Sequence, residues 1–236
     1  MGAKRAKKDD WKKQRKVGHL SQIKNKFYIF CEGIQTEPNY FIGFKRYIEQ
    51  NSIYKNLVLL EVEGVGADTE RVIAYAERYV SNNKIRNAQI WCVYDKDSFP
   101  PEHFNRVSEH ARDLNVLNKD KNIVYNVAWS NQCIEYWFVL HFNYYDSDNE
   151  RPYYIKNINQ NFKNKGLSDY DKSKDKVLFE KLTWQGDPKL AIRYAKQRDD
   201  ECCGISDADS SPATKVYVLV EELAKYLPDE IKERYL

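Results

Sequence analysis

The sequence lacks any apolar segment long enough to cross a lipid bilayer and any cysteine spacing that indicates cross-linking. Spanning takes roughly 20 consecutive apolar residues, and no run among the 236 residues approaches that length. The N-terminus, 1–16, is charged and has no apolar stretch of the kind found in secretory signals. The five cysteines are an odd number without CxxC spacing, which argues against a disulfide framework or a zinc ribbon. These absences predict a cytoplasmic protein that has no membrane partner.

A net charge of one sign is also nearly absent, because 38 Lys and Arg face 35 Asp and Glu. The balance is uneven along the chain. Residues 1–26 carry ten basic and two acidic groups, a net of +8, whereas residues 27–236 carry 28 and 33, a net of −5. We interpret 1–25 as a basic, flexible arm that contacts nucleic-acid phosphates through Lys12, Lys13, Arg15 and Lys16. A solvated tail without a partner is the equally weighted alternative.

What the sequence has in abundance is aromatic residues, with 18 Tyr, 10 Phe and 5 Trp. This content excludes a wholly disordered chain, and the length suits one large domain. Four short apolar runs (27–31, 57–62, 90–94 and 123–129) end about every 32 residues. Helical spacing of apolar residues fills the gaps at 37–50, 69–80 and 101–117. This rhythm predicts an α/β fold, a mostly parallel sheet flanked by helices and covered on both faces.

The second half of the chain has a different pattern. A buried helix is predicted over 132–142, with Ser130 as its N-cap, and a long polar excursion over 143–175. Asp187 followed by Pro188 predicts a helix over 187–198, and Ser211-Pro212 predicts the start of another. We therefore divide the chain into the arm (1–25), an α/β core (26–142) and a helical C-terminal part packed on the core (143–236).

Acidic residues follow three of the predicted strands, at the edge where open α/β sheets bind ligands. Glu32 ends the first run, and Asp95 and Asp97 end the third. In an extended segment, residues i and i+2 point the same way, so both aspartates face one cation and Glu32 completes an oxygen site for Mg²⁺ or Mn²⁺. The alternative is that these carboxylates cap helices or stay solvated. Glu63 fits the same pattern, and we interpret its surroundings as a flexible loop.

Two further groups are candidates. Glu135, near the start of the predicted helix, is either an additional metal ligand or general base, or one half of an internal ion pair. A second basic concentration is interleaved with tyrosines in the C-terminal part and is a weaker candidate for binding bases and phosphates; its members are Lys172, Lys174, Lys176, Arg193, Lys196, Tyr153, Tyr154 and Tyr170.

Four segments resemble the RloB family, which is related to the abortive-infection protein AbiLii. The segments are FYIFCEGIQTEPNYFIGF (27–44), the D-x-D after 93–94, SNQCIEYWFVLHF (130–142) and PATKVYVLVEEL (212–223). Together they span most of residues 26–226. The resemblance implies a Toprim-like (Rossmann-like) fold, as in topoisomerases, primases and OLD-type nucleases.

The resemblance also implies a site and a role. Toprim centres bind Mg²⁺ with a Glu after the first strand and a D-x-D after a later one, which Glu32, Asp95 and Asp97 match. Glu37 and Glu135 match family positions whose roles stay open here. The family implies prokaryotic anti-phage defence beside an AAA or ABC-type ATPase partner, with nucleic acid, tRNA among the candidates, as the target.

Our interpretation is a metal-dependent phosphodiesterase acting on RNA or DNA. Two alternatives stay open: a haloacid-dehalogenase-like phosphatase that uses Asp95 as nucleophile, and a non-catalytic regulatory or sensing subunit of an ATPase complex. The sequence does not decide whether the substrate is RNA or DNA, what activates the protein, or whether the chain forms a homo-oligomer.

Overall fold

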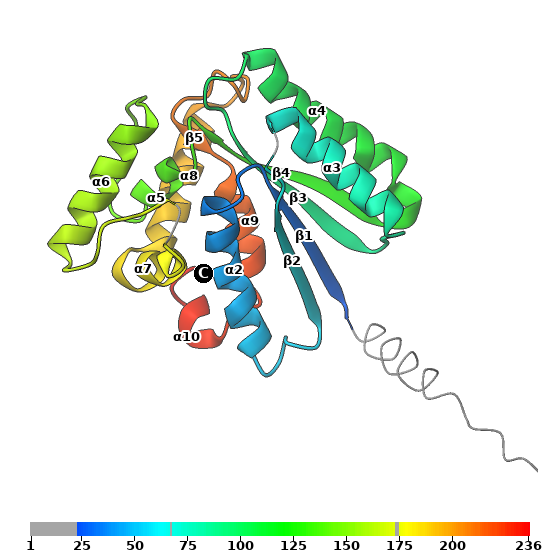
Figure 1. Cartoon of the computed structure of the whole chain (residues 1–236), viewed down its shortest axis with the longest axis horizontal. Helices are drawn as coiled ribbons and strands as arrows, with labels where there is room; N and C mark the ends of the chain where they lie inside the picture. The colour runs from blue at the N-terminus through cyan, green and yellow to red at the C-terminus, as the bar shows by residue number, and fades with distance from the viewer. Residues whose placement is uncertain (1–22, 67, 173–174) are drawn as a thin grey trace, which may run out of the picture.

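The computed structural model describes residues 23–66, 68–172 and 175–236, and the strands in this part of the chain form a five-stranded sheet of order β2-β1-β3-β4-β5 (Figure 1). The first four strands are parallel, and β5 pairs antiparallel with β4. The bounds are β1 Asn25–Cys31, β2 Val58–Gly64, β3 Ala88–Asp95, β4 Ile123–Asn131 and β5 Ala213–Thr214. The α/β class with a mostly parallel sheet is therefore confirmed.

Helices connect the parallel strands and then make up most of the C-terminal part. Those of the first half are α2 (Thr36–Gln50), α3 (Thr69–Asn82) and α4 (Pro101–Leu117), followed by a short 3₁₀ turn (Lys119–Lys121). Those of the second half are α5 (Glu135–Val139), α6 (Arg151–Asn164), α7 (Leu178–Gln185), α8 (Pro188–Glu201), α9 (Val216–Ala224) and α10 (Asp229–Lys232). No helix in the described residues is long and apolar enough to cross a membrane.

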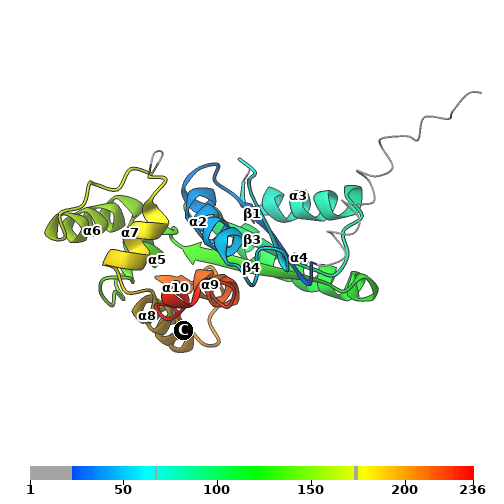
Figure 2. The ribbon, with the colours of Figure 1, turned by 90° about the horizontal axis from the view of Figure 1, so that it is seen from below.

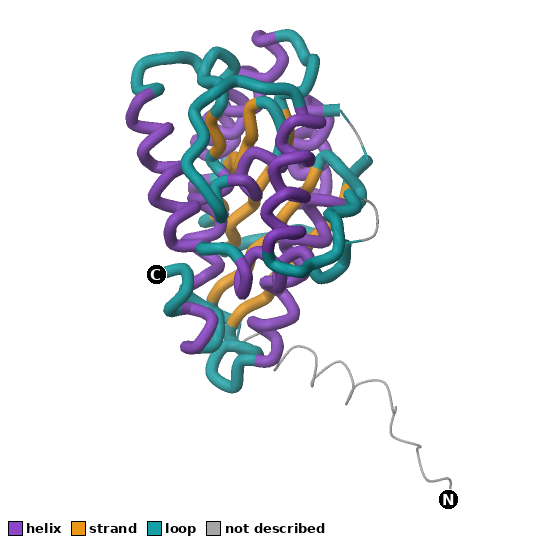
Figure 3. The backbone as a smooth tube through the Cα atoms, turned by 90° about the vertical axis from the view of Figure 1, so that its left-hand side faces the viewer, coloured by secondary structure: helices purple, strands orange, loops and turns teal. Residues whose placement is uncertain are grey.

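The sheet is buried on both faces, as its continuous apolar strands predict. Within β1, Phe27 and Ile29 belong to one core and Phe30 to the other. The core containing Phe30 lies under α3 and α4, and the opposite core lies under α2 and α9 (Figure 2). Viewed from the side in Figure 3, helices surround the strands.

An aromatic cluster joins the C-terminal helices to the core. Phe44 of α2 contacts the rings of Phe179 in α7 and Tyr235 near the C-terminus, with centroids 4.7 and 5.5 Å apart. Gly43 lies against Phe179 so closely that a Cβ atom at this position would overlap the ring. Edge-on aromatic packing of this kind adds to the hydrophobic stabilisation of both helices.

Three local predictions are wrong. Ser130 lies within β4 and does not cap a helix; α5 begins only at Glu135 and has five residues. The helix expected from Ser211-Pro212 begins at Val216, because Ala213 and Thr214 first pair with the end of β4. At Ser130 and at Ala213–Thr214, hydrogen bonds to a neighbouring strand override the local helix signal. The Asp187 cap, which needs no distant partner, is confirmed by its bond from the Leu190 N–H.

Candidate metal centre

Glu32 and Asp95 meet because β1 and β3 are adjacent parallel strands. The register pairs Cys31 with Val93, so both strands end at the same edge of the sheet. The Glu32 N–H donates to the Val93 carbonyl at 2.9 Å, and the Asp95 N–H donates to Glu32 Oε2 at 3.0 Å. The Thr69 hydroxyl, at the start of α3, lies 3.5 Å from both Glu32 carboxylate oxygens. Backbone and hydroxyl donors thus hold the Glu32 side chain against the end of β3.

Asp97 reaches the same site after a sharp turn. The Lys96 and Asp97 N–H groups donate to the carbonyls of Ser130 and Gln132, at 2.9 and 3.0 Å. Asp97 has a φ of 39°, in the left-handed region, so the backbone here is not extended and the predicted i, i+2 alignment does not apply. The two aspartates nevertheless converge, because both lie 2.8 Å from the same nitrogen, Nη2 of Arg151.

Arg151 is the residue of this site that the sequence did not single out. It is the first residue of α6, and its Nε also lies 3.3 Å from Glu135 Oε2, without hydrogen-bond geometry. Its three acidic partners come from β3, the loop after β3 and α5. The sequence offers no signal for it, because Arg151 is an isolated arginine in a polar segment.

Glu135 and Glu37 complete the cluster from its buried side. Glu135 is fully buried, and the Tyr170 hydroxyl donates to its Oε1 at 3.1 Å. Glu37 of α2 is 4% exposed, and its carboxylate lies so close to Gly33 that a Cβ atom there would overlap it. The absence of a side chain at Gly33 therefore leaves the space that the Glu37 carboxylate occupies. We call Glu32, Glu37, Asp95, Asp97 and Glu135 the carboxylate cluster.

Burial and mutual repulsion raise the pKa values of Glu32, Glu37 and Asp95. Burial raises the pKa of Glu32 to about 7, against the lowering effect of the Asp95 N–H. Burial, then Glu37 and Glu135, raise the pKa of Asp95 well above its usual value. The pKa of Glu37 is raised by burial and by Glu135, while Arg151 lowers the pKa values of both Asp95 and Glu37. Acids crowded out of water in this way indicate a site in which Arg151 alone does not balance the negative charge.

The donor set of the carboxylate cluster suits a hard divalent cation. Among the described residues, three of its buried oxygens have no hydrogen-bond partner: Asp95 Oδ1, Glu37 Oε2 and Glu135 Oε2. Uncompensated carboxylate oxygens are the ligands that Mg²⁺ and Mn²⁺ take. In the described part of the chain, however, no three acidic, His or Cys side chains are arranged closely enough to hold a metal ion as they stand. The carboxylate oxygens suit a divalent metal ion. Their positions in this structure are those of acids paired with Arg151, which neutralises part of their charge.

Access to the cluster is from the Asp97 side. The Asp97 side chain is 37% exposed, whereas that of Asp95 is 5% exposed. A groove of about 340 Å³ opens beside Asp97, and its lining includes the basic Lys96 and the acidic Asp148 and Glu150. A cation in this groove would meet Asp97 first.

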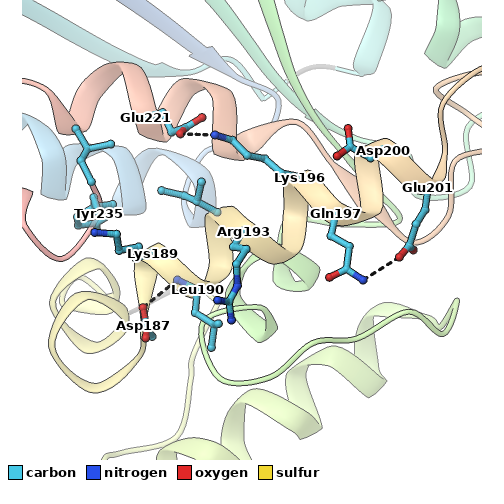
Figure 4. Close-up of a pocket in the computed structure, with 12 residues that line it drawn as sticks. Asp187, Lys189, Leu190, Arg193, Lys196, Gln197, Asp200, Glu201, Glu221 and Tyr235 are labelled. Atoms are coloured by element: carbon cyan, nitrogen blue, oxygen red, sulfur yellow. Dashed lines mark hydrogen bonds and ion pairs between the residues drawn. The ribbon is translucent and has the colours of Figure 1, made fainter.

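A second groove, of about 920 Å³, runs along α8 and contains none of the cluster residues (Figure 4). Its basic groups are matched by acidic ones: Lys196 pairs with Glu221 at 2.6 Å, and Asp200 and Glu201 lie in the same lining. A charge-balanced groove that shares no residue with the cluster gives no support to a nucleic-acid site at Lys196, so we assign it no chemistry.

Other residues that the sequence singled out lie elsewhere. Glu63 lies near the end of β2, before a loop, and accepts a hydrogen bond from the Tyr75 hydroxyl. His141 is buried, with Nδ1 3.0 Å from the Trp137 carbonyl, and burial lowers its pKa to about 4, as befits a neutral core residue. The proposed phosphate contacts Lys12, Lys13, Arg15 and Lys16 lie outside the described residues.

Comparison with known proteins gives one match. The family model described as RloB-like protein matches residues 27–223. This range includes the whole sheet except the first two residues of β1, and it includes every member of the carboxylate cluster. No curated protein and no solved structure matches the chain. The protein therefore belongs to the RloB-like family.

Proposed function

We propose that this protein is a metal-dependent nuclease that hydrolyses phosphodiester bonds of RNA or DNA. The observation that carries the proposal is the convergence of Glu32, Asp95 and Asp97 at one edge of a parallel sheet, with an unpartnered buried oxygen on Asp95. Three carboxylates at the ligand-binding edge of such a sheet are a donor set for Mg²⁺ or Mn²⁺. The Toprim-like assignment implied by the family resemblance uses the same residues.

Asp95 and Asp97 would hold the cation, with Glu32 as a further ligand or as the group that exchanges a proton. When bound, a divalent cation neutralises phosphate charge and supplies an activated water. Glu32 suits proton exchange because its pKa of about 7 lies near neutral pH. The Asp95 N–H and the Thr69 hydroxyl orient its carboxylate without removing that basicity.

The exposed face of α6 supports nucleic acid as the substrate. This helix has no acidic residue, and its solvent-facing stripe consists of Tyr153, Lys156, Gln160, Lys163 and Asn164. Tyr153 is 47% exposed. Exposed aromatic rings stack bases, and lysines bind the backbone of single strands. The stripe is therefore a candidate surface for nucleic acid on the outer face of α6, whereas Arg151 lies on the inner face with Tyr154 and Ile158.

Purified Asp97→Asn protein tests the proposal, with Asp113→Asn on the exposed face of α4 as the matched control. We expect Mn²⁺-dependent cleavage of single-stranded RNA or DNA to fall at least about 100-fold in Asp97→Asn and to be unchanged in Asp113→Asn. Unchanged cleavage in both Asp97→Asn and Asp95→Asn would refute it.

The phosphatase alternative has less support. Its nucleophile, Asp95, has a side chain that is only 5% exposed, and its Oδ2 accepts a hydrogen bond from Arg151, so a small phosphate ester has poor access to it. A phosphatase would retain hydrolysis of small phosphate esters in Glu32→Gln, whereas the nuclease would lose cleavage.

We further propose that the nuclease acts in anti-phage defence with an ATPase partner, as the family resemblance implies. A non-catalytic subunit of the same complex is the remaining alternative. Co-expression with a candidate ATPase distinguishes these alternatives. A nuclease cleaves nucleic acid either alone or in complex with the ATPase, whereas a non-catalytic subunit cleaves it in neither state.

A further inference from the structure

Arg151 occupies a position that the proposed metal centre would need for its cation. Its Nη2 nitrogen lies 2.8 Å from a carboxylate oxygen of Asp95 and 2.8 Å from one of Asp97. These are the two residues proposed as principal ligands. Positive charge therefore already neutralises the two carboxylates that a divalent ion would bind, while Asp95 Oδ1 has no hydrogen-bond partner.

We propose that Arg151 is a displaceable counter-ion, which neutralises the Asp95–Asp97 pair in the metal-free protein and leaves it when a divalent cation binds. This inference rests on the proposed function, because it concerns the same carboxylates. It makes Arg151 a residue that sets metal affinity.

Simultaneous occupation by the guanidinium and a metal ion is unfavourable on two grounds. Mg²⁺ binds oxygens at about 2.0–2.1 Å, so the ion would lie within a few ångströms of Nη2. At that separation, a divalent ion and a guanidinium repel strongly in the poorly solvated surroundings of Asp95. The oxygens shared by Nη2 are also no longer free to face the ion.

The surroundings of Arg151 permit the displacement. Its side chain is 26% exposed, whereas that of Glu135 is fully buried and held by Tyr170. The contact between Arg151 Nε and Glu135 lacks hydrogen-bond geometry, so this end of the guanidinium is not locked. Asp97 borders the open groove of about 340 Å³. A guanidinium that swings away from Asp97 therefore has room beside the groove, whose lining offers Asp148 and Glu150 as other acidic partners.

Isothermal titration with Mn²⁺ tests the inference on wild type, Arg151→Met, Arg151→Lys and Arg46→Met. Arg46 is the matched control, because it forms a 2.7 Å ion pair with Glu180 away from the cluster. We expect Arg151→Met to bind Mn²⁺ at least about tenfold more tightly than wild type, roughly 1.4 kcal/mol. Arg46→Met should match wild type. Arg151→Lys keeps the charge, which provides a folded variant with near wild-type affinity should the methionine variant not fold.

If Arg151→Met binds Mn²⁺ as tightly as wild type or more weakly, the inference about Arg151 is overturned and the proposed function is not affected. Tighter binding without cleavage by any variant supports the displaceable arginine and removes the nuclease proposal. Absence of Mn²⁺ binding to folded wild type and to the variants would remove both.

Discussion

Substituting Glu32 by Gln should stabilise the metal-free protein, and should do so only above acidic pH. Glu32 is partly buried beside other carboxylates, and burial is the largest cause that raises its pKa from 4.5 to about 7. Gln keeps the shape and an oxygen that accepts the Asp95 N–H, but it carries no charge. The substitution thus removes the electrostatic cost and retains the local hydrogen bond.

The magnitude follows from proton linkage. A carboxyl group whose pKa is higher in the folded than in the unfolded state favours folding while protonated. This advantage is complete below about pH 4.5 and is lost as the pH rises towards 7. One pKa unit corresponds to about 1.4 kcal/mol, so ionised Glu32 costs about 3 kcal/mol above pH 7. Glu32→Gln should therefore be about 2–3 kcal/mol more stable than wild type at pH 8 and equally stable at pH 4.

Urea unfolding in EDTA across pH 4 to 8 measures the difference, with Glu109→Gln on the exposed face of α4 as control. We expect the control to follow wild type at every pH. Added Mn²⁺ should stabilise wild type more than Glu32→Gln, because the variant lacks one charged ligand. A stability difference that does not change with pH, or a variant less stable than wild type at pH 8, would refute the reasoning.

Three further outcomes are expected. Replacing Lys156 and Lys163 of α6 by Ala should weaken single-stranded nucleic-acid binding and reduce the slope of log affinity against log salt by about 1.4, since each phosphate contact contributes about 0.7; Lys119→Ala, at the opposite end of the sheet, should change neither. Deleting 1–25 should likewise weaken binding and flatten the salt dependence, and an unchanged slope would return this segment to a solvated tail. Gly43→Ala should lower the free energy of unfolding by about 1–3 kcal/mol in urea titrations, because its Cβ overlaps an aromatic ring of α7.

The sequence by itself determined the α/β class with its four parallel strands, and it pointed to the first three acids of the candidate site. Apolar runs of strand length, separated by helical spacing, allow little other than consecutive βα units. Parallel strands place their carboxyl ends at one edge, so the sequence predicts that Glu32, Asp95 and Asp97 share this edge. That Glu32 and Asp95 are neighbours follows from the adjacency of β1 and β3, which the order of the runs along the chain does not give. The sequence also argued against disulfide bonds, and Cys31 and Cys92, which lie in such apolar runs, are free and buried.

Only the tertiary structure decided what surrounds those three acids. Glu37 and Glu135 enter the cluster because α2 and α5 pack against the carboxyl edge of the sheet, and a helix position alone does not specify that packing. Arg151 lies 54 residues beyond Asp97 in the chain, in a segment whose path depends on the aromatic core beneath it. Local apolar patterns predict which residues of a single helix or strand face the protein core. Which distant charge neutralises a buried carboxylate is a property of how the elements fold together.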